Sequence, residues 1–139
     1  MRGLRRSKAD RDELRRDEQR KARLDAPTLR ALLPTAAQVS VKLTFDVDAQ
    51  LAQAPLTSTV FPPARAHFVY GCPFGDCDGT YDLDAEIFGM LRAGVCQATG
   101  EQHCCGHRAR RHGRGPRCGL GLTYAVVVQY QAQRVTAAP

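Results

Sequence analysis

From Gln38 to Asp48 the chain alternates strictly between apolar and polar side chains. Successive side chains of a β-strand point to opposite faces of a sheet, so this alternation predicts a strand with one buried face. The apolar positions expected on that face are Val39, Val41, Leu43, Phe45 and Val47.

A second alternating run, residues 118–133, predicts the last strand of the chain. The side chains expected on its buried face are Leu120, Leu122, Tyr124, Val126, Val128 and Tyr130. Ala125 and Val127 are apolar on the opposite face, which predicts a central strand covered on both sides.

The segment between these runs predicts shorter elements. Residues 65–70 and 81–83 have the composition of short strands. Residues 85–93 favour a helix that Asp84 caps and Gly94 ends. A strand at residues 84–93 stays an alternative, because apolar side chains also occupy alternate positions there.

A further strand is predicted at residues 95–105, interrupted by a turn at Thr99-Gly100. Three prolines and small polar residues predict a loop for residues 49–64. A second loop is expected at residues 106–117, where glycines and arginines predominate.

Residues 4–33 predict a charged helical arm. Acidic and basic side chains are interspersed there and allow ion pairs between residues four positions apart. A second short helix is expected at residues 27–33. The arm is either solvated or ordered on a nucleic acid or protein partner. The apolar positions of the arm before residue 27 are Leu4, Leu14 and Leu24. They are too sparse to form a stripe that packs on a core.

The net charge of +6 is unevenly distributed along the chain. Residues 1–33 carry eleven Lys/Arg against six acidic residues, and residues 34–105 carry three against eight. Residues 106–139 carry six arginines and no acid, which predicts an anionic partner such as nucleic acid. No apolar run is long enough for a membrane span, and the N-terminus lacks the apolar core of a secretory signal. We therefore expect a cytoplasmic protein with reduced cysteines.

The cysteines are the strongest chemical signal. Cys72 and Cys77 flank a turn in which Pro73 fixes one φ angle and glycines permit a tight reversal. Such a turn brings two thiolates together, as half of a tetrahedral zinc site requires. Cys118 begins the last strand and would meet Cys104 or Cys105 across the loop, completing a site for Zn²⁺.

Adjacent residues of a strand point to opposite faces, so only one of Cys104 and Cys105 would face the metal. We select Cys104 and expect Cys105 to face the core. His103, His107 and Cys96 are alternative ligands. This arrangement resembles the zinc-ribbon class over residues 68–122, although the first pair is spaced Cys-x4-Cys and the second is no knuckle. The resemblance implies a closed structural zinc site.

Other interpretations of these residues are a phosphatase loop, a calcium loop, a Cys nucleophile, disulfides and buried free thiols. Asp76 and Asp78 resemble the nucleophile loop of haloacid-dehalogenase-type phosphatases, in which Asp76 would be the nucleophile and Asp78 the acid/base. A calcium loop is disfavoured because Gly79 does not fall at the required sixth place. A Cys nucleophile with His103 or His107 as base has no oxyanion element beside it, and disulfides or buried free thiols are further alternatives.

The loop at residues 106–117 predicts the contact surface. Its five arginines suit phosphate, because the planar guanidinium donates two parallel hydrogen bonds: Arg108, Arg110, Arg111, Arg114 and Arg117. We predict a non-enzymatic adaptor or regulatory module that docks on nucleic acid or a nucleoprotein. The first alternative is a protein–protein interaction module that uses residues 4–33, and a small phosphatase-like enzyme is the second.

The expected architecture is α+β. It comprises a small antiparallel, zinc-ribbon-like sheet of four or five strands with one short helix and an N-terminal charged helical arm. The predicted division is a helical arm at residues 1–33 and a zinc-stabilised, β-rich domain at residues 38–133.

Overall fold

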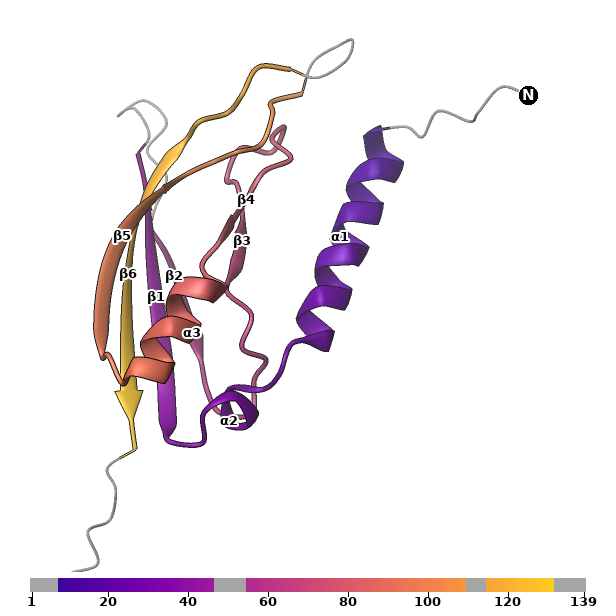
Figure 1. The fold of residues 1–139 in the computed structure, drawn as a ribbon. Coiled ribbons are helices and arrows are strands. Elements are labelled where there is room, and N and C mark those ends of the chain that lie inside the picture. The colour runs from indigo at the N-terminus through magenta and orange to yellow at the C-terminus, as the bar shows by residue number, and fades with distance from the viewer. Residues whose placement is uncertain (1–7, 47–54, 110–114, 132–139) are drawn as a thin grey trace, which may run out of the picture.

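The computed structural model describes residues 8–46, 55–109 and 115–131, and its architecture is α+β, as predicted (Figure 1). A four-stranded antiparallel sheet has the strand order β2-β1-β6-β5, and β3 and β4 pair as a second, two-stranded sheet. The elements are α1 (Lys8–Asp25), α2 (Leu29–Leu32), β1 (Ala36–Phe45), β2 (Leu56–Val60), β3 (Val69–Gly71), β4 (Thr80–Asp82), α3 (Asp84–Ala93), β5 (Gln97–His103) and β6 (Gly121–Tyr130).

The two long strands β1 and β6 form the centre of the main sheet, and both predicted alternations are confirmed. Val41 lies opposite Val126, and Leu43 lies opposite Tyr124, so the apolar side chains of both strands share one face. All four of these side chains are buried. Residues 47 and 48, the predicted end of the first strand, lie outside the described residues.

Three elements cover this apolar face: α3, α2 and the β3–β4 pair (Figure 1). Ile87 and Leu91 of α3 are buried in the core, together with Phe68 and Tyr81 from the segments around the small sheet. The rings of Phe45 and Tyr81 lie 6.0 Å apart and join the main sheet to β4. The buried Tyr81 therefore lies between the sheet and the turn that carries the first cysteines.

Residues 84–93 form a helix, and Gly94 ends it with a φ of 69°. The predicted cap is wrong, because Leu83 stands at the N-cap without a side-chain hydrogen bond, and the N–H of Asp84 donates to the Asp82 carboxylate at 2.9 Å. The carboxylate of Asp84 instead accepts a hydrogen bond from the Phe68 amide at 2.6 Å. Asp84 thus fixes the segment before β3 against the start of α3.

Two other local predictions are wrong. Residues 56–60 were expected in a loop but form β2, with Val39 opposite Val60 and Leu43 opposite Leu56. No turn interrupts β5 at Thr99-Gly100. The ring of Tyr124 lies over Gly100, where a Cβ atom would collide with it. Gly100 therefore makes room for a core aromatic ring.

Strand β6 is central, but its second face is open. Val127 keeps 41% of its surface exposed, so the predicted cover on both sides is wrong. The open face is mostly polar, with Lys42 and Thr44 of β1 exposed beside Thr123 of β6. Strand β6 also begins three residues later than predicted, because the chain turns at Gly119, which has a φ of 63°.

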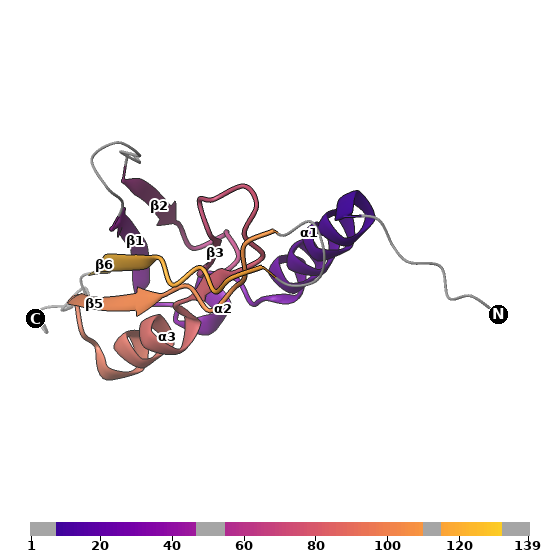
Figure 2. The same cartoon turned by 90° about the horizontal axis from the view of Figure 1, so that it is seen from above.

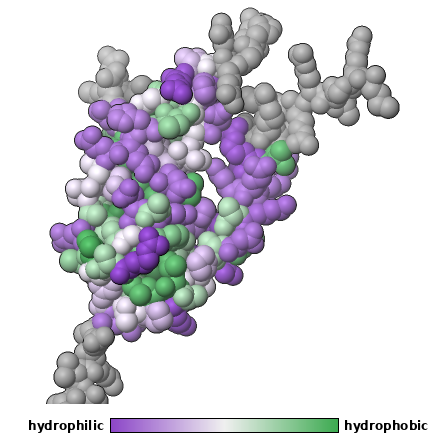
Figure 3. Space-filling model, viewed as in Figure 1, coloured by the Kyte–Doolittle hydropathy of each residue, from purple (hydrophilic) through white to green (hydrophobic). Residues whose placement is uncertain are grey.

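The N-terminal helix α1 projects to one side of the sheet layers (Figure 2). Its surface is mostly hydrophilic (Figure 3), and its two described leucines, Leu14 and Leu24, are 41% and 60% exposed. The following α2 is anchored, because Thr28 caps it and Leu29 is fully buried in the core. Residues 4–7 lie outside the described residues, and the predicted division at residue 33 stays a prediction. None of the described helices is long and apolar enough to cross a bilayer.

Candidate metal centre

The candidate metal centre has two halves, each of which carries two cysteines. The first half is the turn between β3 and β4, with Cys72 and Cys77. The backbone N–H of Cys72 donates to the carbonyl of Gly79 at 3.0 Å, which closes the base of the turn. Inside it, the N–H of Cys77 donates to the carbonyl of Phe74 at 3.1 Å. These two hydrogen bonds hold Cys72 and Cys77 on one side of the turn.

The second half joins the end of β5 to the start of β6. The N–H of Cys104 donates to the carbonyl of Leu120 at 2.9 Å, and the N–H of Cys118 donates to the carbonyl of Gly106, also at 2.9 Å. Gly119 adopts a φ of 63°, a left-handed conformation that glycine reaches without strain. The chain can therefore turn directly from Cys118 into β6.

The two halves are built alike around a Cys-x-Gly sequence. Gly79 donates its N–H to the sulfur of Cys77 at 3.4 Å, and Gly106 donates its N–H to the sulfur of Cys104, also at 3.4 Å. In each half the carbonyl of that glycine accepts from the second cysteine, Cys72 or Cys118. The centre therefore has approximate two-fold symmetry.

The two glycines face each other at the middle of the centre. A Cβ atom at Gly79 would collide with the sulfur of Cys104, and one at Gly106 would collide with the Gly79 backbone. The close approach of the two halves therefore requires glycine at both positions.

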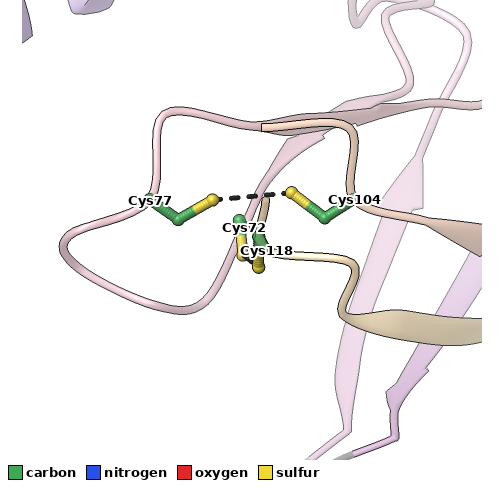
Figure 4. A group of neighbouring side chains, drawn as sticks. All are labelled: Cys72, Cys77, Cys104 and Cys118. Atoms are coloured by element: carbon green, nitrogen blue, oxygen red, sulfur yellow. Dashed lines mark hydrogen bonds between the residues drawn. The ribbon is translucent and has the colours of Figure 1, made fainter. Parts of the chain in front are cut away.

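The four sulfur atoms of Cys72, Cys77, Cys104 and Cys118 all lie within 4.8 Å of one another (Figure 4). The separation is 3.8 Å for Cys72–Cys118 and 3.5 Å for Cys77–Cys104. A tetrahedral ion with metal–sulfur bonds of about 2.3 Å places its ligands about 3.8 Å apart. All four cysteines are free thiols rather than disulfides. The four side chains can therefore bind one metal ion.

The electrostatics of the cluster favour a bound cation. Burial raises the pKa of the Cys72 thiol, and burial likewise raises the pKa of Cys104 to about 11. Burial acts on Cys118 in the same direction, but hydrogen bonds from the Leu120 N–H and the neighbouring thiols outweigh it, so its pKa is lowered. Thiols packed this closely cannot all ionise unless a positive charge compensates them.

Backbone N–H groups surround the sulfurs. In addition to Gly79 and Gly106, the N–H of Phe74 faces Cys72 and that of Leu120 faces Cys118. Each of these donors lies two residues after its cysteine, and those at Cys72, Cys104 and Cys118 favour the thiolate form. Tyr81 also binds the second half of the centre, because its hydroxyl donates to the carbonyl of Leu120 at 2.8 Å.

The remaining predicted ligands lie outside this cluster. Cys105 is exposed, so the expectation that it faces the core is wrong. The exposed Cys96 precedes β5, and His103 points to the open face of the sheet. His107 takes part in an isolated bridge with Arg117 instead.

The two aspartates singled out for phosphatase chemistry join the two loops of the centre. Asp78 accepts a hydrogen bond from the His107 N–H at 2.6 Å. Asp76 accepts one from Nε of Arg108 at 2.7 Å, and its own carbonyl accepts from the Ala109 N–H at 2.7 Å. Both carboxylates thus accept hydrogen bonds that connect the two loops.

Arg108 of the basic loop contacts both an aromatic ring and a carboxylate. Its guanidinium carbon lies 4.1 Å from the ring centroid of Phe74, in addition to the ion pair with Asp76. Arg117 is exposed next to Cys118. Arg110, Arg111 and Arg114 lie outside the described residues.

Replacement of Asp76 with asparagine is expected to leave the domain folded and able to bind metal. The Asp76–Arg108 pair is more than a third exposed on both sides, and exposed ion pairs add little to stability. Circular dichroism and metal content should match those of the wild type. Loss of the fold would instead make this ion pair a structural requirement.

Sequence reasoning missed the two glycines at the middle of the centre and the contact of Phe74 with Arg108. The repeated Cys-x-Gly at 77–79 and 104–106 was a usable signal. It marks Cys104, rather than Cys105, as the counterpart of Cys77. The Phe74–Arg108 contact has no such signal, because it depends on how the two loops meet.

Comparison of the chain with models of known protein families, with curated proteins and with solved structures found no match in any of the three.

Proposed function

We propose that the four clustered cysteines bind one structural Zn²⁺ ion. Four thiolates at tetrahedral separations are typical of structural zinc, which takes closed coordination and has no redox chemistry of its own. The two cysteine pairs of a zinc ribbon would correspond to the two symmetric halves described above. Such an ion stabilises the fold and leaves no open position for a substrate.

We further propose that this zinc centre presents the basic loop, residues 106–117, to nucleic acid or a nucleoprotein, and that the protein is a non-enzymatic adaptor or regulatory module. One observation carries this proposal: both ends of the loop are fixed at the centre, through Cys104 and Cys118. Hydrogen bonds from Arg108 N–H to the Pro116 carbonyl and from Ala109 N–H to the Asp76 carbonyl extend this attachment along the loop.

Four arginines of the loop are the proposed phosphate contacts: Arg110, Arg111, Arg114 and Arg117. Arg108 is not among these proposed contacts, since its guanidinium pairs with Asp76 and stacks on Phe74. Phosphate contacts release counterions, so binding should weaken steeply as the salt concentration rises. The loop contains no Phe, Tyr or Trp for base stacking, and we expect little sequence preference.

A variant with serine at Arg110, Arg111, Arg114 and Arg117 is expected to lose most of its affinity for RNA and DNA oligonucleotides. The slope of log affinity against log salt should fall by about 0.7–0.9 for each contact removed. Fluorescence anisotropy over a salt series measures both quantities, while thermal stability should not change.

A control variant removes the same number of charges from the N-terminal helices. It carries serine at the exposed Arg16, Arg20, Arg23 and Arg30 and should bind as the wild type does. Equal losses in both variants would indicate a diffuse charge effect, and no loss in the loop variant would remove the loop from the proposal.

A further inference from the structure

Strand β5 forms one edge of the main sheet, and half of its backbone groups point away from β6. The Val128 N–H donates to the Cys96 carbonyl, and the Cys104 N–H donates to the Leu120 carbonyl. Pairing in an antiparallel ladder alternates along each strand. The even-numbered residues of β5 therefore bond to β6. The residues that point their N–H and C=O groups to the free edge are Gln97, Thr99, Glu101 and His103.

The opposite edge of the sheet, β2, is shorter and flanked by prolines. The Asp46 N–H donates to the Gly121 carbonyl, so even-numbered residues of β1 bond to β6 and odd-numbered ones bond to β2. Thr57 and Thr59 consequently point to the free edge of β2. Pro55 precedes this strand and two prolines follow it, a common protection against the addition of a strand.

Strand β5 has none of these protections. It extends over seven residues, contains no proline or lysine, and pairs with β6 without a register shift. No other strand in the described part of the chain pairs with it. Figure 1 shows it as the outermost strand on its side of the sheet. A regular, unprotected edge of this kind is a template for another strand.

We propose that β5 pairs with β5 of a second copy of this chain, antiparallel and centred on Gly100. An antiparallel partner must match outward-pointing residues with outward-pointing residues. A register centred on Gly100 does so for the whole strand, because it places Thr99 opposite the partner's Glu101 and Gln97 opposite the partner's His103. The outward-pointing N–H and C=O groups of the edge then meet partners on the second copy, and the His103 carbonyl exchanges its weak contact with the Cys105 thiol, at 3.7 Å, for a backbone N–H.

The charges on β5 select this register over its neighbour. A shift that centres the pair on Glu101 would place two carboxylates directly opposite each other, which is unfavourable. With Gly100 at the centre, each carboxylate faces a threonine hydroxyl instead. Glu101 is the only acidic residue of the strand, and no basic residue other than His103 lies on it.

The register can be tested with charges at Thr99, an exposed side chain on the open face of the sheet. Thr99→Glu places like charges opposite each other twice in the symmetric dimer, and Thr99→Lys places opposite charges there. We expect the first to weaken dimerisation about tenfold and the second to strengthen it several-fold. Sedimentation equilibrium over a concentration series measures both.

Two proline variants test the edge. Thr99→Pro removes an N–H that β6 does not use, so it should abolish the dimer but preserve the fold and the metal content. Thr59→Pro makes the same change at the opposite edge and should leave the dimer intact. The thermal unfolding curve of each variant confirms that the chain is folded.

The wild type should sediment with twice the 15.3 kDa mass of the chain as its concentration rises. A wild type that is monomeric up to about 1 mM, a binding free energy of only about −4 kcal/mol, overturns the proposal. A dimer that resists Thr99→Pro, or one that responds equally to Thr99→Glu and Thr99→Lys, overturns it as well. These outcomes are independent of nucleic acid binding.

Discussion

Replacement of Cys77 with serine is expected to abolish metal binding and cooperative folding of the domain. Binding of structural zinc contributes an apparent free energy of about 10–16 kcal/mol, whereas a whole domain is stable by about 5–15 kcal/mol. The side chain of Cys77 also lies 3.5 Å from that of Cys104, so the change disrupts the contact between the two halves of the centre. Cys72→Ser should have the same effect.

Elemental mass spectrometry and thermal unfolding test this prediction. The wild type should carry about one zinc ion per chain and expose its thiols on chelation. Cys105→Ser is the matched control, because Cys105 is exposed, adjacent in sequence to Cys104 and outside the cluster. Wild-type stability in both the Cys72 and Cys77 variants would refute the structural role of the metal.

Replacement of Gly106 with alanine is expected to open the centre without removing a ligand. The added Cβ would collide with the backbone of Gly79 and approach the carboxylate of Asp78 to 2.8 Å. Backbone atoms cannot rotate away as a side chain can. We expect overpacking to cost about 1–3 kcal/mol, to which the weakened metal binding adds.

Competition with a chromogenic zinc chelator measures the change in metal affinity. Gly75→Ala is the control, since a Cβ there would have no neighbour within 4 Å. If Gly106→Ala and Gly75→Ala bound zinc equally, the close approach of the two halves would not be a requirement for the centre.

The sequence predicted the elements whose burial alternates over many residues. Strand β1 follows this pattern from Val39 to Phe45 and β6 follows it over ten residues, and α3 has a terminating glycine. Strand β2 escaped prediction because only Val60 is buried in it, and because its flanking prolines indicate a loop. Its strand structure comes from pairing with β1, a long-range interaction that no local pattern contains.

The turn expected at Thr99-Gly100 failed for a related reason. Glycine in a strand often marks a turn, but at Gly100 it serves the packing of Tyr124, which is distant in sequence. The same limit applies to the centre. Spacing indicated which cysteines could meet, whereas the roles of Gly79, Gly106 and Phe74 depend on the contact between two loops.

The position of β6 constrains how the protein can be synthesised and folded. This last strand separates β1 from β5, so until it leaves the ribosome the main sheet consists of the β1–β2 hairpin alone. Cys118 lies three residues before β6, so the fourth sulfur arrives at nearly the same time. Synthesis of β6 therefore completes the apolar core and the cysteine cluster in one step. A stop codon or frameshift shortly after residue 117 should leave a nascent chain for proteases rather than a partly active domain.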